Sequence, residues 1–262
     1  MMKAEVVKSR DNPSVRHFAR LSKERAYREE CREYVLEGAK LLSEALSSGI
    51  RPKTVFFLEK CRRDFDFGVL EGCEGIRLYS TDERVIDKIS DVKSPQGIVF
   101  SCPLPDTALP ERLPQGFYLI LDGLSDPGNL GTIVRTADAF ALDGIMLTGA
   151  CADPFSPKTV RSAMGSLFRV RLCRGEPNQI KAALDASDIP IFSALPSDEA
   201  GRITEIFASC AAVAIGSEAH GVSEQVRALS RGAVTIPMKG RAESLNAAVS
   251  AAIVMWEMTK RG

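Results

Sequence analysis

Short apolar runs alternate with longer amphipathic stretches through the second half of the chain. Each run holds five or six residues with few polar members, which is typical of strands covered on both faces of a parallel sheet. The runs predict strands over 117–122, 144–149, 168–173, 189–194, 211–216 and 233–237. Between them, apolar residues recur at helical spacing and predict helices. These helices span 129–141, 157–166, 177–186 and 223–230, and a long terminal helix lies within 244–262.

The first hundred residues also mix the two patterns, but less regularly. Strands are predicted over 33–38, 53–59, 76–80 and 97–102, and helices over 39–49 and 81–90. Asn12 is suited to cap a first helix that Pro13 begins, and Thr81 or Asp82 is suited to cap the helix over 81–90. The alternation indicates a small α/β unit. No catalytic constellation is visible in it.

The stretch "CPLPDTALPERLPQG" separates the two patterns and contains four prolines. Proline removes a backbone donor and disfavours helix at the residue before it, so the stretch is interpreted as a linker. We therefore predict an α/β protein with a domain over 1–102, a linker over 103–116 and a larger domain over 117–262. Both domains fall within the usual size range.

The overall composition indicates a globular protein with balanced charge, but one segment is clearly basic. Apolar residues form 45% of the 262-residue chain, and 34 Lys and Arg balance 34 Asp and Glu. Residues 1–28, however, carry eight basic side chains against three acidic ones. Such a segment can contact phosphates, although a solvated helix face explains it equally well. The candidate phosphate contacts are Arg10, Arg16, Arg20, Lys23, Arg25 and Arg28.

Several classes of protein are disfavoured. The first residues are polar and do not resemble a signal peptide, and no apolar run approaches the length of a membrane span. The seven cysteines form no C-x-x-C pair and suit a reducing cytoplasm. His17 and His220 are the only histidines, so we expect no metal site.

Three loops at predicted strand ends carry the candidate chemistry, because ligands of parallel α/β sheets bind beyond the carboxyl ends of strands. The first, "SDPGNLGTIVRTADAF", offers Asn129 as a helix N-cap and places Arg135 opposite the buried stripe. The second, "GSEAHGVS", brackets Glu218 with two glycines, and in the third, "MKGRAESLNAAVSAA", Ser244 would cap the terminal helix. Taken singly, these residues could be a solvated arginine, an exposed acid and a simple cap.

In this order, N-x-G-x-x-x-R, G-x-E-x-x-G and I-P-M followed by S-L-N resemble the motifs of the SpoU (TrmH-like) RNA ribose 2′-O-methyltransferases of the SPOUT superfamily. The resemblance covers residues 117–262. The stretches "SRDNPSVRHFARL", "YVLEGAKLLSEAL" and "SPQGIV" are similar to the ribosomal-protein-like substrate-binding domain of such enzymes. The resemblance implies a deep trefoil knot in the C-terminal domain, an N-terminal RNA-binding domain, S-adenosylmethionine as cofactor and a homodimer formed through the knotted domain.

The resemblance also implies roles for individual residues. The catalytic set would be Arg135, Asn129, Glu218, Ser244 and Asn246. The cofactor would be held by Thr148, Gly149, Gly216, Ile236, Pro237, Met238, Ser244, Leu245 and Asn246. In the family Arg135 is sometimes drawn as the general base, but a charged guanidinium has no acceptor, so stabilising an oxyanion or clamping a phosphate is chemically easier.

The RNA target and two rival functions stay open at this point. The two-domain layout favours ribosomal over transfer RNA by analogy with family members. The cysteine pattern and the lack of a signal peptide indicate the cytoplasm as the compartment. A nicotinamide-dependent oxidoreductase is disfavoured, because the turn lacks the G-x-G-x-x-G pattern and its following acid. A non-catalytic RNA-binding protein of the same fold is disfavoured because every polar motif position is occupied.

Overall fold

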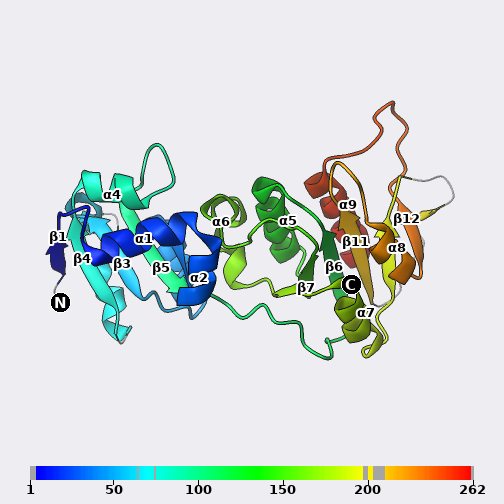
Figure 1. The fold of residues 1–262 in the computed structure, drawn as a ribbon, viewed down its shortest axis with the longest axis horizontal. Coiled ribbons are helices and arrows are strands. Elements are labelled where there is room, and N and C mark those ends of the chain that lie inside the picture. The colour runs from blue at the N-terminus through cyan, green and yellow to red at the C-terminus, as the bar shows by residue number, and fades with distance from the viewer. Residues whose placement is uncertain (1–3, 64, 74, 197–199, 203–209, 261–262) are drawn as a thin grey trace. The chain divides into compact units, whose positions relative to one another are not determined.

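A computed structural model describes residues 4–63, 65–73, 75–196, 200–202 and 210–260 of the chain. All candidate site residues named above lie among them. The chain divides into two compact units. The first contains Met1–Pro105 with Phe155–Phe168, and the second contains Asp106–Pro154 with Arg169–Gly262. Figure 1 shows the helices and strands of both units.

The first unit is built on a five-stranded mixed sheet in the order β1-β4-β3-β5-β2. Strands β1, β4 and β3 are parallel, whereas β5 runs antiparallel to β3 and β2. The strands are β1 (Glu5–Val7), β2 (Glu33–Glu37), β3 (Thr54–Leu58), β4 (Arg77–Thr81) and β5 (Ile98–Pro103). Every residue of β3 is buried, as its apolar run predicts for a central strand.

Helices of the first unit begin where their capping residues predict. Asn12 accepts a hydrogen bond from the Ser14 amide at 2.9 Å, and Pro13 is the first residue of α1. Asp82, not Thr81, caps α4. The helices are α1 (Pro13–Lys23), α2 (Arg25–Cys31), α3 (Ala39–Ser47) and α4 (Glu83–Ile89), with short 3-10 turns η1 (Glu59–Arg63) and η2 (Phe67–Gly72). Neither α2 nor β1 was predicted.

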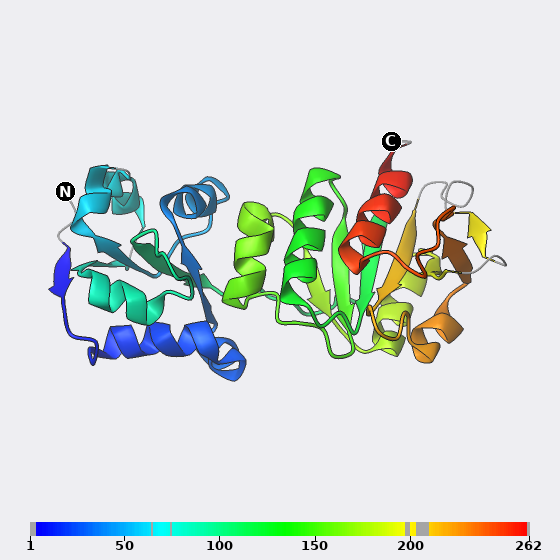
Figure 2. The same cartoon turned by 90° about the horizontal axis from the view of Figure 1, so that it is seen from above.

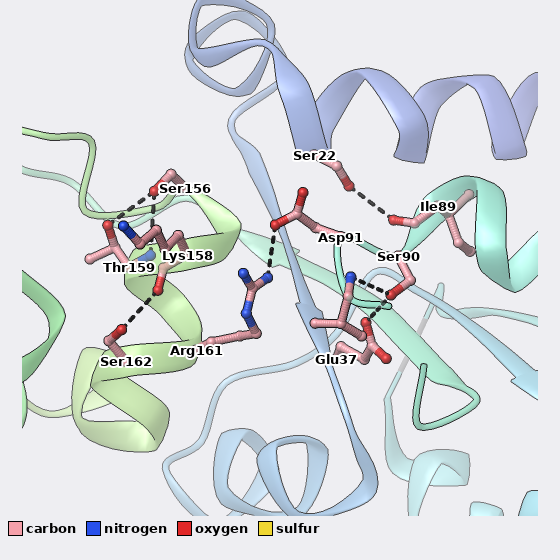
Figure 3. A network of polar contacts seen from close by, with 11 residues as sticks. Ser22, Glu37, Ile89, Ser90, Asp91, Ser156, Lys158, Thr159, Arg161 and Ser162 are labelled. Atoms are coloured by element: carbon pink, nitrogen blue, oxygen red, sulfur yellow. Dashed lines mark hydrogen bonds and ion pairs between the residues drawn. The ribbon is translucent and has the colours of Figure 1, made fainter. Parts of the chain in front are cut away.

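Residues 155–168 belong to the first unit although they lie far along the sequence. They form α6 (Pro157–Ala163) and the 3-10 turn η3 (Met164–Phe168). The Phe155 ring lies 5.2 Å from the Tyr34 ring, and Arg161 pairs with Asp91 at 2.9 Å (Figure 3). The sequence assigned this segment to the domain over 117–262. The difference arises because its apolar side chains find their partners on the first unit.

The second unit contains a seven-stranded sheet in the order β10-β12-β9-β11-β6-β7-β8, and all of its paired strands are parallel. The strands are β6 (Phe117–Asp122), β7 (Gly144–Thr148), β8 (Leu172–Arg174), β9 (Ile191–Ala194), β10 (Gly201–Arg202), β11 (Ala211–Gly216) and β12 (Gly232–Thr235). The prediction of an α/β protein with a C-terminal parallel sheet is confirmed. Strand β8 begins later than the predicted run over 168–173.

Helices cover both faces of this sheet. Helices α5 (Pro127–Ala139) and α9 (Ala247–Thr259) pack side by side on one face (Figure 2). Helices α7 (Pro177–Asp185) and α8 (Glu224–Leu229) pack together against the other, where Tyr118 and Ile120 of β6 join their core. Since alternate strand residues point to opposite faces, β6 is buried from both sides.

The proline-rich stretch is not an extended spacer along its whole length. From Asp106 onward it belongs to the second unit. Leu113 is buried in the core of that unit, and its amide donates to the Ser187 hydroxyl at 2.8 Å. The Arg174 amide donates to the Thr107 carbonyl at 2.8 Å. After β5 ends at Pro103, the rest of the stretch forms no helix or regular strand, and Leu113 fixes it to the core of the second unit.

No helix within the described ranges is both long enough and apolar enough to cross a bilayer. The seven cysteines are all free thiols.

Candidate functional site

Three strand ends of the second unit meet at one level of the sheet. In the parallel register, Asp122 of β6 lies opposite Thr148 of β7 on one side and Gly216 of β11 on the other. Thr148 and Gly216 are two of the residues predicted to hold a cofactor. The carboxyl ends of parallel strands are the place where ligands of such sheets bind, so the loops that follow these ends form the candidate site.

The loop after β11 folds back over its own strand. Ser217 and Gly221 exchange two backbone hydrogen bonds of 3.2 and 2.9 Å. A Cβ on Gly216 would lie 1.8 Å from the carbonyl carbon of Gly221, so no other residue fits there. Gly221 itself adopts φ 66, which favours glycine. The two glycines of the G-x-E-x-x-G motif thus shape a tight turn that presents Glu218 at its surface.

Helix α5 begins two residues before the predicted start. Asp126 accepts from the Asn129 amide at 2.7 Å and is the N-cap, and Pro127 is the first helical residue. The prediction that Asn129 caps the helix is therefore wrong. Its side chain instead makes tertiary contacts: its Nδ2 donates to Glu218 Oε1. At its other end α5 stops at Ala139, because Ala141 takes φ 51 outside the helix.

Helix α9 is also capped by a residue other than the predicted one. Asn246 Oδ1 accepts from the amides of Ala248 and Val249 at 2.9 and 3.3 Å, so Asn246 rather than Ser244 is the N-cap. The remaining amide nitrogen of Asn246 donates to Asn129 Oδ1 at 3.2 Å. Each polar atom of this side chain therefore has a partner, which fixes its orientation.

A continuous hydrogen-bonded chain results, Glu218–Asn129–Asn246. Its links join residues 89 and 117 positions apart in the sequence, one from each of the three motif loops. A carboxylate can only accept hydrogen bonds, so Glu218 holds the amide nitrogen of Asn129 toward itself and turns its oxygen to Asn246. The three loops that the sequence singled out are thus one polar cluster.

Arg135 lies on the open face of α5, as predicted. Leu130, Ile133, Val134 and Ala137 are buried on the opposite face. Arg135 itself is exposed, and within the described part of the chain it has no ion pair or hydrogen bond. Helix α5 therefore contributes Asn129 to the polar cluster and, six residues further along, exposes the Arg135 guanidinium to solvent.

The other predicted cofactor residues line the strand ends and the loop before α9. Thr148 is buried, and its hydroxyl has no hydrogen-bond partner among the described residues. Gly149 follows it with φ 62. Ile236 and Leu245 are half-buried, whereas Pro237, Met238 and Ser244 are exposed. The loop carries no regular structure, so its apolar side chains remain at the surface.

Two residues at this edge were missed by the sequence analysis. Asp122 is a buried carboxylate whose Oδ2 accepts from the Ser223 amide at 2.7 Å, which ties β6 to the start of α8. The Cys151 thiol donates to the carbonyls of Leu121 and Thr148, both at 3.1 Å, and so joins the ends of β6 and β7. Burial raises the pKa of the Cys151 thiol, which keeps it a donor. An acid that ends an apolar strand was the signal for Asp122.

The basic residues predicted to contact phosphate fall into three groups. The Arg28 side chain is buried and donates to the Leu21 carbonyl at 2.5 Å, so it cannot serve as a surface contact. Arg20 pairs with Glu24 and lies over the Tyr27 ring at 3.7 Å, and Arg25 pairs with Glu29. The remaining three, Arg10, Arg16 and Lys23, are exposed.

No group of three or more His, Cys, Asp or Glu side chains is placed to hold a metal ion in the ranges that the structure describes. The candidate site contains the Asn129 and Asn246 amides, the Glu218 and Asp122 carboxylates, the Thr148 hydroxyl and the Arg135 guanidinium.

Both parts of the chain match known protein families. Residues 116–256 match the model of the SpoU rRNA Methylase family, and residues 12–99 match an MRM3-like substrate binding domain. The chain is 29% identical over 252 residues to the 23S rRNA (guanosine(2553)-2'-O)-methyltransferase RlmP of Bacillus subtilis, covering 96% of this chain and 98% of that protein. It is 30% identical over 244 residues to the 23S rRNA (uridine(2479)-2'-O)-methyltransferase of Streptomyces viridochromogenes, covering 87% of this chain and 83% of the other.

A solved structure is similar to this chain over nearly its whole length. An AdoMet-bound rRNA methyltransferase from Sinorhizobium meliloti superimposes with a TM-score of 0.87 at 28% identity, over 98% of both chains.

Proposed function

Because the chain belongs to the SpoU rRNA methylase family, we propose that it transfers a methyl group from S-adenosylmethionine to a ribose 2′-hydroxyl of large-subunit rRNA. The observation that carries the proposal is the Glu218–Asn129–Asn246 cluster, which unites the three motif loops at the carboxyl edge of the sheet. The 23S rRNA 2'-O-methyltransferase activities of the relatives above and the AdoMet-bound structural neighbour support it.

The residues at the strand ends suit S-adenosylmethionine. The buried hydroxyl of Thr148 has no hydrogen-bond partner among the described residues, and since such groups are nearly always hydrogen-bonded in native proteins, it is available to a ligand. Gly149 lacks a side chain at the end of β7, and Gly216 allows the tight turn after β11, so both glycines shape the backbone at the strand ends. Half-exposed Ile236, Met238 and Leu245 supply apolar surface for the adenine ring. When bound, the cofactor supplies an electrophilic methyl group on a sulfonium cation.

The protein residues would then position and stabilise the sugar. A guanidinium carries five donors and no acceptor, so Arg135 is suited to stabilise negative charge on the ribose oxygen or to hold the adjacent phosphate. Asn129, fixed by Glu218 and Asn246, would orient the nucleotide. Alignment of this kind can contribute roughly 7–11 kcal/mol to lowering a barrier. Ser244 would complete the pocket rim.

RNA would be held by exposed basic residues of the first unit. The strongest candidates are Arg10, Arg16 and Lys23. Arg28 is buried, and Arg20 and Arg25 are each paired with a glutamate. Phosphate contacts set position rather than sequence specificity. We expect the logarithm of RNA affinity to fall linearly with the logarithm of salt concentration. Binding measured at 50, 100 and 200 mM KCl tests this, and an affinity that does not respond to salt would contradict it.

The finer architecture completes the proposal. The last strands and α9 would form the trefoil knot of the SPOUT fold, and two copies would associate through α9. Val249 and Trp256 on this helix are 48% and 54% exposed, and the Trp256 ring centre lies 5.9 Å from that of Phe140, which directly follows α5. Two exposed large apolar side chains on one helix suit an interface. Trp256→Glu should convert a dimer to a monomer in analytical ultracentrifugation, and a wild-type monomer would contradict the dimer.

Mapping ribose methylation in total RNA tests the function itself. Cells with and without the gene should differ at a 2′-O-methyl site in large-subunit rRNA. A difference confined to tRNA would replace the proposed substrate. An unchanged methylation map would contradict the proposal. Ribosomal RNA and a full set of free cysteines favour the cytoplasm as the compartment.

A further inference from the structure

The first unit contains a pocket of about 370 Å³ that no step of the proposed reaction uses. Its wall is made partly by β2, α3 and the loop after α4, and partly by α6 of the segment 155–168. This volume falls within the range of roughly 300–1,000 Å³ that is typical of small-ligand sites. Figure 3 shows α6 on one side of the pocket region and the loop with Ser90 and Asp91 on the other.

The floor of the pocket is apolar. Its lining includes Leu41, Ile89, Val92, Val160 and Met164. Met164 reaches this position with φ 54 and ψ −146, a backbone conformation that residues other than glycine rarely adopt. A thioether and branched side chains form a surface on which a flat ring can lie. An aromatic ring is therefore the group that the floor fits.

The acidic groups of the pocket are already satisfied. Glu37 accepts from the Ser90 hydroxyl at 2.5 Å and from the Gln96 amide at 2.8 Å. Asp91 pairs with Arg161 at 2.9 Å (Figure 3). These carboxylates are therefore held by the protein, and they would not be the groups that a ligand contacts first.

Two polar groups at the rim are left for a ligand. The Lys40 ammonium is exposed, and the Gln96 side-chain amide lies over Gly38, where a Cβ would be only 2.5 Å from its oxygen. In the described ranges neither head group has a hydrogen-bond or ion-pair partner. A carboxamide can both donate to and accept from a base edge, and an ammonium binds phosphate.

We propose that this pocket captures one unstacked nucleotide of the RNA substrate. The base would lie on the apolar floor with its edge at Gln96, and its phosphate would meet Lys40. Sequence-specific recognition of RNA relies largely on splayed bases that are hydrogen-bonded at their edges, and here an apolar surface takes the place of the aromatic side chains on which such bases often stack. Ser22 at the pocket rim is next to Lys23, so the pocket and the basic face of α1 adjoin. This inference rests on the proposed function, since it assumes an RNA substrate.

Three full-length variants test the proposal against one control. Lys40→Ala and Gln96→Ala remove the rim contacts, and Val92→Trp enlarges a half-buried apolar lining residue so that it fills the pocket. Lys93→Ala removes a neighbouring exposed cation that does not line the pocket. Binding is measured by fluorescence anisotropy with labelled fragments of deproteinised large-subunit rRNA. Calorimetry with S-adenosylmethionine and the thermal midpoint check that the site in the second unit and the fold are intact.

Val92→Trp should weaken RNA binding about tenfold, because the indole would fill the space that the base is proposed to occupy. Lys40→Ala and Gln96→Ala should each weaken it about three- to tenfold, while Lys93→Ala and cofactor affinity stay within about twofold. Wild-type affinity in Val92→Trp would overturn the proposal. So would an equal loss in Lys93→Ala and Lys40→Ala, which would indicate a general basic surface or a different occupant such as a peptide.

The experiments distinguish failure of the nucleotide pocket from failure of the proposed function. If the wild-type protein methylates rRNA but the pocket variants bind it normally, only the nucleotide pocket is wrong. If the wild-type protein methylates no RNA, the proposed function is wrong whatever the variants bind.

Discussion

The polar cluster of the second unit and the pocket of the first unit are held in place by different means. The cluster rests on backbone geometry: strand ends in register, a turn closed by Gly216 and Gly221, and helix caps at Asp126 and Asn246. The pocket rests on side-chain packing of a segment from elsewhere in the sequence. Substitutions that alter backbone space should therefore damage the cluster, and substitutions that remove buried side-chain volume should damage the pocket.

Phe155→Ala gives the largest expected effect on stability. Phe155 is buried and packs on Tyr34, so its truncation should cost about 3–5 kcal/mol of unfolding free energy. Arg161→Ala, which removes an exposed ion pair from the same segment, should cost less than about 1 kcal/mol. Urea unfolding followed by circular dichroism compares them. Equal losses would mean that the ion pair, not apolar packing, holds the segment.

Arg135→Ala should reduce methyl transfer about 10²–10³-fold, the typical loss on removing one donor that stabilises an oxyanion. Affinity for S-adenosylmethionine should stay within about twofold, because Arg135 does not belong to the strand-end loops. Turnover with tritiated cofactor and calorimetry give the two values. Arg231→Ala, at another exposed arginine, is the matched control. Substantial turnover in Arg135→Ala would remove this residue from the catalytic set.

Gly216→Ala should lower cofactor affinity by about tenfold to a hundredfold. The new methyl group would lie 1.8 Å from the Gly221 backbone, so the turn must open. Gly232→Ala in β12 is the control, since its Cβ would approach nothing closer than 3.9 Å. Calorimetry should show the loss only at position 216. Unchanged affinity there would mean that the turn does not shape the cofactor site.

The smallest expected effect is a pH-dependent contribution of Glu33, in the first unit, to the stability of the fold. Burial acts to raise its pKa, but hydrogen bonds from His17 and Lys53, at 3.3 and 2.9 Å, outweigh burial and lower the pKa to about 2. A depressed pKa stabilises the fold above the usual pKa of about 4.5, and this contribution is lost as pH falls toward 2.

With allowance for partial exposure, this contribution is about 2 kcal/mol. Urea unfolding of the wild type and Glu33→Gln between pH 6 and pH 3 should show the difference between them shrinking with acidity. A difference in unfolding free energy that stays constant from pH 6 to pH 3 would contradict the stabilising role of ionised Glu33.

The regular elements and the cluster could be predicted because each leaves a local signature. Apolar runs predicted the strands of both sheets except the short edge strands β1 and β10, and Asn12 with Pro13 predicted the start of α1. The three motif loops contain glycines and polar residues at strand ends, and parallel strands bring such ends together. The choice of cap failed at Asn129 and Ser244 because two suitable residues stand close together in each loop, and only tertiary contacts decide between them.

The first-unit pocket could not be predicted for a different reason. Segment 155–168 has the periodicity of any amphipathic helix, and nothing in that pattern says which apolar surface will cover it. Arg28 shows the same limit, because charge alone suggested a phosphate contact for a side chain that is buried. Asp122 and Cys151 were missed because their roles depend on neighbours in other strands.

The central claim is that this chain methylates a ribose oxygen of rRNA, and the linkage of the product tests it most directly. Purified protein is incubated with deproteinised large-subunit rRNA and tritiated S-adenosylmethionine, and the RNA is hydrolysed in alkali. A 2′-O-methyl group blocks cleavage at its own phosphate, so we predict label in alkali-resistant dinucleotides, and its loss in Arg135→Ala. Label in mononucleotides, which indicates base methylation, or no incorporation by the wild type, would contradict the account.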